Sequence, residues 1–468
     1  MEEKITETIE ILSPEERIPE IEMLTEMIDG KRFSDFKKIV ESVPPADVAG
    51  LLENMEEKHS ATAYRLLPKE LAAEVFVEMG PELQEHLINS FTDAELSRML
   101  EELYIDDTVD IIEEMPAVVV KRIIKNSKNE NRDIINRLLK YPKDCAGAIM
   151  TTEYVRFKRD MTVSDALAHI RHVAIDKETI YTCYVTDEKR RLIGIVTAKE
   201  LLISPLDKTL EDIMEESVIF AKTTDDKEEV ALKFDRYGFL ALPVVDAECR
   251  LVGIITVDDA ISVLKEEAEE DFAKMAAITP SETPYLKTSV FTLWKSRIVW
   301  LLFLMVSATF SSAILNKFES FLPAVLLIFV PMLMGTGGNG GGQSSVTIIR
   351  AISLGEVEFS NLLKIMWKEV RVGAFCGITL GVVAFLKVLF VDRWIMQNPA
   401  VTASVALAVA LSVVITIIVS KLVGSMLPLI AKKIGFDPAV MASPFITTLV
   451  DILALLLYFA ISYILLPI

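Results

Sequence analysis

Cysteine and histidine are both scarce in this sequence, with four of each among 468 residues. The cysteines show no paired spacing, which suits a reducing compartment and argues against a zinc knuckle. They are Cys145, Cys183, Cys249 and Cys376. The segment HIRH supplies two of the histidines, but no cysteine or third histidine is near it. We therefore expect a helix surface there rather than a metal site.

Other signals are missing as well. The opening MEEKITETIE has no apolar core, so no cleavable signal peptide is expected. No Walker lysine or phosphorylatable ATPase motif is evident, so we expect neither an enzyme nor coupling to hydrolysis. Basic residues are outnumbered, 48 Lys and Arg against 68 Asp and Glu, for a net charge of −20. This balance argues against nucleic acid and for cations as partners.

The charge is unevenly distributed. From Thr283 onward thirteen basic residues outnumber seven acidic ones, whereas the preceding part holds 35 basic and 61 acidic residues. The chain thus has an acidic, soluble front and a hydrophobic, slightly basic back. The back contains five apolar runs, each long enough for a span of roughly 20 residues. They are RIVWLLFLMVSATFSSAIL, FLPAVLLIFVPMLMG continuing to VTIIRAI, VGAFCGITLGVVAFLKVLFV, VTASVALAVALSVVITIIVSKLVGSMLPLI and SPFITTLVDILALLLYFAISYILL.

The flanking charges predict the orientation of these spans. If the front is cytoplasmic, nine basic residues flank the spans on the inside and two on the outside. The inside residues are Lys287, Lys295, Arg297, Arg350, Lys364, Lys368, Arg371, Lys432 and Lys433, and the outside residues are Lys317 and Arg393. We therefore expect a multi-pass protein of the cytoplasmic membrane with its N terminus inside and its C terminus outside.

The stretch PMLMGTGGNGGGQSS resembles a dinucleotide-binding fingerprint, with Glu356 about twenty residues on, where a ribose-binding acid would stand. That fingerprint needs a preceding strand and a βαβ unit. Here the glycines interrupt a helix at membrane depth, where they allow close helix packing or expose carbonyls to a cavity. Two amides at this depth favour a pore or its support. The candidates are Gly335, Gly337, Gly338, Asn339 and Gln343.

A single acid, Asp451, lies in the middle of the fifth span. Burying an acid at the bilayer centre costs about 2.5–3.5 kcal/mol on insertion scales. Thr447 and Thr448 share its helix face, and oxygen ligands of this kind suit a hard cation such as Mg²⁺. The alternative is a structural acid bonded to a neighbouring helix. Asp437, at the cytoplasmic mouth, is expected either to cap the fifth helix or to hold an ion.

The soluble front begins with a twelve-residue repeat over residues 45 to 125. Each unit is a short amphipathic run, such as PADVAGLLENM, that closes on an apolar residue. Short repeated amphipathic runs predict a solenoid of short helices. Asp106 and Asp110 lie one turn apart on its surface, where solvated charge is the simplest interpretation. The repeated apolar residues are Met55, Leu67, Met79, Phe91, Leu103 and Met115.

Residues 144 to 268 carry a second duplication. Met150 in the first copy corresponds to Met214 in the second, and Gly194 corresponds to Gly253. Each copy is predicted to form a strand, a helix, two strands and a helix. This order, with the endings IGIVTAKE and VGIITVDD, resembles a tandem cystathionine-β-synthase (CBS) pair. KEEAEEDFAKMAAI follows and is expected to be helical. Its acids Glu267, Glu270 and Asp271 form one face, which repels the acidic module unless cations lie between them.

Taken together, an acidic solenoid, a CBS pair, a connecting helix and five spans with PMLMGTGGNGGGQS and TTLVDILALL resemble the MgtE family of magnesium channels. The resemblance covers essentially the whole chain. We expect a multidomain protein with an all-α superhelical N-terminal domain (1–143), two α/β CBS domains (144–205 and 206–264), a connecting helix (265–285) and an α-helical membrane domain of five transmembrane helices (286–468).

The resemblance implies a homodimer with an axial pore that intracellular Mg²⁺ locks closed. It implies that Asp451 holds hydrated Mg²⁺ and that Asp437 contacts locking ions. The implied sensor acids are Asp106, Asp110, Asp226, Glu228, Asp259, Glu267, Glu270 and Asp271. Gly238 stands where an acid is expected in some relatives, so one sensor site is expected to be missing or weaker. CBS pairs often bind adenine nucleotides, so ATP is considered between the copies, with Tyr181 or Tyr184 and Phe239 stacking on the base.

Three alternatives stay open. The first is a less selective conduit for Co²⁺, Mn²⁺ or Zn²⁺, although the spans offer no soft ligands besides Cys376 and methionines. The second is a membrane-anchored nucleotide sensor that conducts nothing. The third is an NAD-dependent membrane enzyme.

Overall fold

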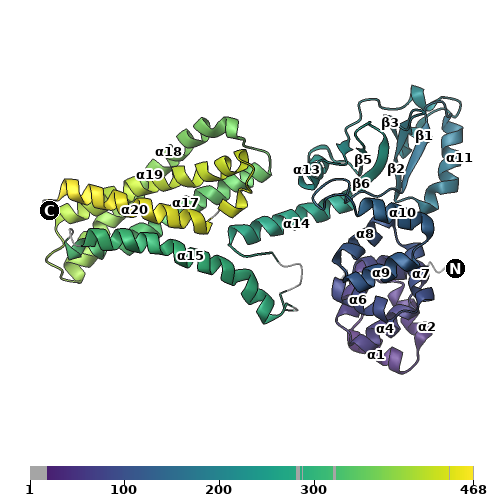
Figure 1. Ribbon diagram of the computed structural model, residues 1–468, viewed down its shortest axis with the longest axis horizontal. Coiled ribbons are helices and arrows are strands. Elements are labelled where there is room, and N and C mark those ends of the chain that lie inside the picture. The colour runs from purple at the N-terminus through teal and green to yellow at the C-terminus, as the bar shows by residue number, and fades with distance from the viewer. Residues whose placement is uncertain (1–17, 281–284, 287, 320–322, 442, 467–468) are drawn as a thin grey trace, which may run out of the picture. The chain divides into compact units, whose positions relative to one another are not determined.

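The computed structural model describes residues 18–280, 285–286, 288–319, 323–441 and 443–466. Its contacts divide the chain into two compact units, Met1–Leu264 and Lys265–Ile468. Lys287, one of the inside charges counted above, lies outside the described residues. Figure 1 labels most of the helices and strands of both units.

The described part of the first unit begins with ten short helices, most of which are labelled in Figure 1. They are α1 (Ile21–Asp29), α2 (Phe33–Val40), α3 (Pro45–Glu53), α4 (Glu57–Leu66), α5 (Lys69–Val77), α6 (Pro81–Ser90), α7 (Asp93–Glu102), α8 (Ile105–Glu114), α9 (Ala117–Asn126) and α10 (Asn129–Leu138). Alternate helices pack against each other: α3 against α5, α5 against α7, and α7 against α9. The chain therefore winds as a superhelix. The predicted solenoid is confirmed.

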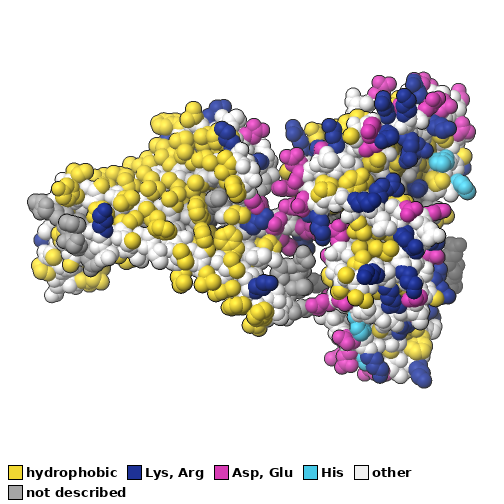
Figure 2. All heavy atoms as spheres, in the orientation of Figure 1, with side chains coloured by type: hydrophobic (Ala, Val, Ile, Leu, Met, Phe, Trp, Pro, Cys, Tyr) yellow, Lys and Arg dark blue, Asp and Glu magenta, His cyan; other side chains and the backbone are white. Residues whose placement is uncertain are grey.

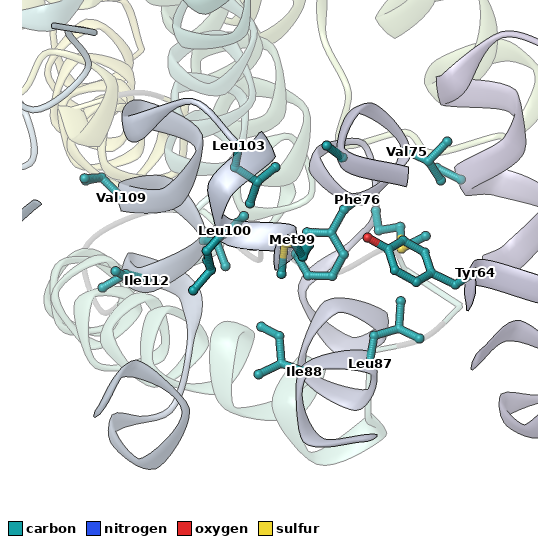
Figure 3. Close-up of a cluster of buried hydrophobic side chains, with 14 of the residues drawn as sticks. Tyr64, Val75, Phe76, Leu87, Ile88, Met99, Leu100, Leu103, Val109 and Ile112 are labelled. Carbon is teal, nitrogen blue, oxygen red and sulfur yellow. The ribbon is translucent and has the colours of Figure 1, made fainter. Parts of the chain in front are cut away.

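The twelve-residue period has a simple structural cause. Each repeated apolar residue lies within two positions after the end of a helix, where the chain turns inward, and each is at most 9% exposed. Leu67, Phe91 and Leu103, for example, directly follow α4, α6 and α7. Figure 3 shows how side chains from successive helices then meet in one core, with Tyr64 and Phe76 among the largest.

Two small three-stranded sheets follow in the same unit. The first copy consists of β1 (Tyr154–Lys158), α11 (Val163–Val173), β2 (Thr179–Thr186), β3 (Leu192–Thr197) and α12 (Ala198–Ile203). The second consists of β4 (Ala221–Lys222), α13 (Lys227–Tyr237), β5 (Ala241–Val245), β6 (Leu251–Thr256) and α14 (Val257–Met275). In both, the first pair of strands is parallel and the second antiparallel. The predicted order of elements is confirmed twice.

The repeated Met and Gly residues join the two copies. A Cβ on Gly194 would lie 2.6 Å from the sulfur of Met214, and one on Gly253 would lie 2.6 Å from the sulfur of Met150. Each copy therefore places its leading methionine on the glycine in the other copy's sheet. Backbone hydrogen bonds from the N–H of Thr151 to the carbonyl of Ile254, and from the N–H of Ile195 to the carbonyl of Glu215, also connect the two copies.

The second unit is built from long apolar helices. They are α15 (Val290–Glu319), α16 (Ala324–Leu327), α17 (Val330–Ser353), α18 (Leu362–Lys387), which continues as a π-helical segment (Val388–Ile395), α19 (Ala403–Lys433) and α20 (Ser443–Leu465). Among the described residues, five helices or helix pairs are long and apolar enough to cross a membrane. Figure 2 shows hydrophobic side chains covering the visible face of this unit.

The glycine stretch does not interrupt its helix, contrary to the sequence expectation. Helix α17 runs unbroken through all the glycines, and it packs against α19 and α20 along its length. At Gly424 of α19, an added Cβ would lie 2.2 Å from the carbonyl oxygen of Gly341. The glycines thus serve close helix approach, which compensates for their poor helix propensity. The short helix α16 (Ala324–Leu327), rather than a strand, directly precedes α17, so the dinucleotide interpretation has no structural basis here.

The connecting helix is also not a separate element. Helix α14 starts at Val257 as the last helix of the second CBS copy and continues without a break to Met275. Helical geometry ends there, and Ala277 takes a positive φ of 53°. Helix α14 therefore carries the chain from the second CBS copy into the second unit, and it covers the predicted segment from residue 265 as far as Met275.

Candidate ion-binding sites

Asp451 borders a cavity of about 200 Å³ inside the second unit. One carboxylate oxygen, Oδ1, is buried and has no hydrogen-bond partner among the described residues. The Thr448 hydroxyl donates to the carbonyl of Pro444 in its own helix, which leaves its lone pairs free. Helices α15, α17 and α20 form the walls. The lining residues are Ala308, Ser311, Ser312, Leu315, Met334, Thr448, Asp451 and Leu455.

The two serines of the first span were not predicted from the sequence. Ser311 and Ser312 lie in the run ATFSSAIL, which was read only as an apolar span. Both residues line the same cavity as Asp451 because α15 packs against α20. A pair of adjacent hydroxyls in a hydrophobic run was the available signal, since such groups need partners inside a membrane.

The predicted glycine-stretch residues divide between two faces of α17. A Cβ on Gly338 would lie 2.7 Å from the Thr447 methyl and 3.6 Å from Asp451 Oδ1, so this glycine makes room for the acid. Gly337 is buried against Thr416. In contrast, three residues spaced one turn apart face away from the rest of the described chain. These exposed residues are Gly335, Asn339 and Gln343.

Near the C-terminal end of α19, a lysine lies where a metal ion was expected. Lys274 Nζ lies 2.6 Å from an oxygen of Glu270 and 2.6 Å from an oxygen of Asp437. Burial alone lowers the pKa of Lys274, but its hydrogen bonds to both acids raise it overall. Asp437 also accepts from the Ala439 backbone, as a capping residue does. The acidic face predicted for the connecting helix therefore already pairs with a positive charge, that of Lys274.

The other acids of the connecting helix have partners too. Asp271 accepts a 3.0 Å hydrogen bond from the Ser353 hydroxyl at the end of α17. Glu267 is half-buried and engaged in an interaction of its own. These contacts, together with Lys274, anchor the C-terminal half of α14 to the membrane unit.

In the first unit, acids from three segments gather in one place. Asp106 and Asp110 project from α8 towards Asp259 in the first turn of α14. Asp110 is exposed at the surface of α8, but the protein atoms around it, followed by the neighbouring carboxylates, raise its pKa. Burial also raises the pKa values of Asp106 and Asp259 to about 7. Asp106 is 8% exposed, so the expectation of solvated charge at this residue was wrong.

Sequence reasoning missed several members of this acidic cluster. Asp107 joins it from α8, where burial and then Asp259 raise its pKa to about 6. Glu153 and Glu178 join it from the first CBS copy, with pKa values raised to about 7 and about 8. Burial is the main cause in each case. The signal available in the sequence was that these two glutamates immediately precede two strands of one CBS copy.

Two other predicted sensor acids lie elsewhere in the unit. Asp226 is exposed and caps α13, accepting from the backbone N–H groups of Glu228 and Glu229 at 2.9 and 3.2 Å. Glu228 follows in the first turn of the same helix. At its other end, Gly238 adopts a φ of 66° and closes α13. The left-handed backbone favours glycine and explains why no acid stands at this position here.

The nucleotide candidates differ in accessibility. Tyr181 is 65% exposed, and Phe239 is partly buried with Tyr237 stacked beside it. Tyr184 is fully buried between the CBS copies and packs edge-on against Tyr154. Its ring has no free face for a base, so Tyr184 is withdrawn as a stacking residue.

Comparison with known families accounts for most of the chain. The model for the MgtE intracellular N domain matches residues 43–144, and the CBS domain model matches residues 146–206 and 210–266. A further model, described as a divalent cation transporter, matches residues 330–461.

Individual relatives agree with this assignment. The magnesium transporter MgtE of Thermus thermophilus is 36% identical over 92% of this chain and 95% of its own length. The Bacillus subtilis protein of the same name is 32% identical over 93% of this chain and 94% of its own.

Two solved structures resemble the soluble part. The cytosolic domain of the Mg²⁺ channel MgtE in complex with ATP is 35% identical and has a TM-score of 0.50, covering 52% of this chain and all of that one. The soluble part of a magnesium transporter is 29% identical with a TM-score of 0.51, covering 55% of this chain and all of that one. Relatives thus match nearly the whole chain, and the protein belongs to the MgtE family of divalent cation transporters.

Proposed function

We propose that this protein is a Mg²⁺-selective channel of the cytoplasmic membrane that intracellular Mg²⁺ closes. The observation that carries the proposal is Asp451, an acid in a cavity between three spans, with an unpartnered oxygen and hydroxyl groups around it. Such oxygen donors, acting directly or through waters, suit a small hard cation. The relatives that match almost the whole chain are named as magnesium transporters, which supports the same ion.

The exposed stripe on α17 supports a homodimer with the pore on its axis. Asn339 and Gln343 are one turn apart and face away from their own chain. Amides exposed to lipid lack hydrogen-bond partners, and this is costly. A second copy packed across this stripe would enclose the amides beside a water-filled path. The charge bias of the flanks supports a cytoplasmic N terminus and an external C terminus.

A broader divalent specificity is the second candidate, and one contact favours it. Met334 contributes a thioether side chain to the lining of the cavity beside Asp451. Thioethers favour softer metals than Mg²⁺. The hydroxyls of Ser311, Ser312 and Thr448 outnumber this single soft group, so Mg²⁺ remains the proposed substrate, with Co²⁺, Mn²⁺ and Zn²⁺ as competitors to be measured.

For regulation, we assign the acids of the first unit to closing ions. Asp106, Asp110 and Asp259 come together from the helical domain and the second CBS copy, where bound Mg²⁺ would offset their repulsion. At the mouth, Lys274 partly replaces such an ion by pairing with Glu270 and Asp437. We also propose that the CBS pair binds ATP, with Tyr181 and Phe239 available to the base. The ATP complex of the related cytosolic domain supports this assignment.

The test is Mg²⁺ flux into liposomes carrying the protein, with internal and external Mg²⁺ set separately. Flux should occur down the gradient and stop when Mg²⁺ bathes the soluble unit. Parallel assays with Co²⁺, Mn²⁺ and Zn²⁺ rank the ions, and faster flux of any of these would move the assignment to the broader conduit. The absence of flux for all four ions would leave the non-conducting nucleotide sensor as the better interpretation.

The acidic cluster also predicts how stability depends on pH. Burial raises the folded-state pKa values of Asp106 and Asp259 to about 7, above the unfolded value of about 4. The folded state therefore binds more protons than the unfolded state between about pH 4 and pH 8, and stability falls as pH rises through that window. In Mg²⁺-free buffer, we expect the melting temperature of the soluble unit to drop steadily from pH 5 to pH 8.

Saturating Mg²⁺ should remove most of this drop, because the ion neutralises the acids once they are ionised. Circular dichroism melts of the full-length protein in detergent, with and without Mg²⁺, measure both effects. A melting temperature that rises with pH in Mg²⁺-free buffer would contradict the prediction.

A further inference from the structure

Helix α18 has two unlike faces, and one of them packs against α19. Three glycines spaced one turn apart lie on the packed face. A Cβ on Gly373 would lie 3.0 Å from the Cα of Ile418, and one on Gly377 would lie 2.9 Å from the carbonyl oxygen of Val414. This close approach continues at Gly381 and fixes the rotation of α18 about its own axis. Figure 1 shows α18 at the edge of the membrane unit, with α19 beside it.

The opposite face of α18 carries one continuous stripe of exposed side chains. Its residues recur every three or four positions, which keeps them on one side of the helix. The first three are basic, and the four that follow are large and apolar. The stripe consists of Lys364, Lys368, Arg371, Phe375, Ile378, Val382 and Leu386.

This stripe has the dimensions of one membrane leaflet. From Phe375 to Leu386 the helix rises about 16 Å, which is half the thickness of a hydrocarbon core of roughly 30 Å. The basic residues extend the stripe by a further ~10 Å, into the region of the headgroups. Trp367 is 62% exposed beside them, and tryptophan is enriched at this level of a bilayer. The stripe therefore matches the acyl chain and the headgroup of a single phospholipid.

The three basic residues also lack a negative charge to offset them. No acidic residue lies in the first turn of α18, where Lys364 faces the positive end of the helix dipole. Among the described residues, none of the three forms an ion pair with an acidic side chain. Arg371 instead lies over Trp367, with its guanidinium carbon 5.7 Å from the ring centroid. An anion from outside the chain would offset both the helix dipole and the repulsion among the cations.

A second copy of the chain fits this stripe poorly. A two-fold axis along the membrane normal pairs equal patches at equal depth, so the three cations would face the same three cations of the other copy. Like charges at that distance repel each other. The second copy is placed instead at the amide stripe of α17, on a different helix.

We propose that this stripe of α18 binds one anionic phospholipid. The phosphate lies among Lys364, Lys368 and Arg371, and an acyl chain follows the helix from Phe375 to Leu386. Clusters of Lys and Arg beside a membrane span are typical sites for acidic headgroups. The bound lipid holds α18 on α19, which in turn packs against α17. Its binding is measured without any flux, so failure of the channel assignment would leave this site intact.

The first measurement is native mass spectrometry of the full-length protein in detergent, titrated with phosphatidylglycerol or phosphatidylcholine. Each basic residue near a membrane surface contributes about fivefold in affinity for an acidic lipid, so the wild type should prefer phosphatidylglycerol on the order of 100-fold. The triple variant Lys364→Gln/Lys368→Gln/Arg371→Gln should lose most of this preference, because glutamine keeps a polar side chain but removes the charge.

The charge-matched control is Lys295→Gln/Arg297→Gln/Arg393→Gln, which removes three exposed basic residues of the same unit. Lys295 and Arg297 are two positions apart on α15 and so do not share a helix face, and Arg393 lies in the π-helical segment beyond α18. This control should keep the wild-type preference. An equal preference in the wild type and the triple variant, or an equal loss in the control, would overturn the site. Displacement of the lipid by an equal concentration of inorganic phosphate would indicate a site for free anions and would overturn it too.

A second measurement does not depend on folding of the triple variant. Phospholipids brominated near the top of their acyl chains quench the fluorescence of tryptophans that they contact. The part due to Trp367 is the quenching that is lost in Trp367→Phe. Brominated phosphatidylglycerol should quench Trp367 at far lower mole fractions than brominated phosphatidylcholine, and equal quenching by the two lipids would refute the proposal.

Discussion

Asp451→Asn should reduce Mg²⁺ flux through the reconstituted protein by about 100-fold or more. The carboxylate is the single acid lining the cavity, and its Oδ1 has no other partner among the described residues. Removing one member of a buried charge pair costs about 3–5 kcal/mol, and each 1.4 kcal/mol is a factor of about ten in equilibrium. Asparagine keeps the size of the side chain and one oxygen that can bind the ion. A loss of flux would therefore result from the missing negative charge.

The same flux assay supplies the control. Glu356→Gln also neutralises an acid of the membrane unit, but Glu356 is exposed between α17 and α18, away from the cavity. Its flux should match that of the wild type. Glu356 is also the acid that a dinucleotide fingerprint would require, so normal flux in this variant further disfavours that interpretation. Undiminished flux in Asp451→Asn would refute the assignment of Asp451 to the ion path.

Local sequence patterns predicted the helices and strands well because the same pattern of residues recurs in each repeated unit. The residues at twelve-residue intervals turn inward where each helix ends, so Leu67 and Leu103 were recognisable without knowledge of the tertiary structure. The paired Met and Gly residues of the CBS copies were found as a repeat. Their exchange between copies, with Met214 on Gly194, is a tertiary contact that the spacing alone does not reveal.

The features that the sequence did not predict all depend on contacts between distant segments. The glycines were expected to break a helix because their intrinsic propensity is poor, but packing on α19 and α20 outweighs that propensity. Asp106 was expected to be solvated because its own helix surface is acidic. It is buried because the CBS copies cover that surface. Lys274 was passed over because its partner Asp437 is far away in sequence.

Gly424→Ala should lower the melting temperature of the membrane unit by several degrees or prevent its assembly. A Cβ at this position would lie 2.2 Å from the carbonyl oxygen of Gly341 and 2.9 Å from its carbonyl carbon. Both are backbone atoms, so no side-chain rotation relieves the overlap and α17 must move away from α19. Overpacking of this kind costs about 1–3 kcal/mol, and more where the backbone must shift.

Gly335→Ala is the matched control, because within one chain nothing lies within 4 Å of the added methyl group, which would face the proposed water-filled path. Alanine is the better helix former by about 1 kcal/mol, so this variant should melt at the same temperature as the wild type or slightly higher. Thermal unfolding of both variants in one detergent measures the contrast. A melting temperature that falls in Gly424→Ala but not in Gly335→Ala would show that the glycines are needed for helix contact rather than for helix flexibility. If both variants were equally destabilised, the stretch would instead require backbone freedom, and the close contact between α17 and α19 would not be what the glycines provide.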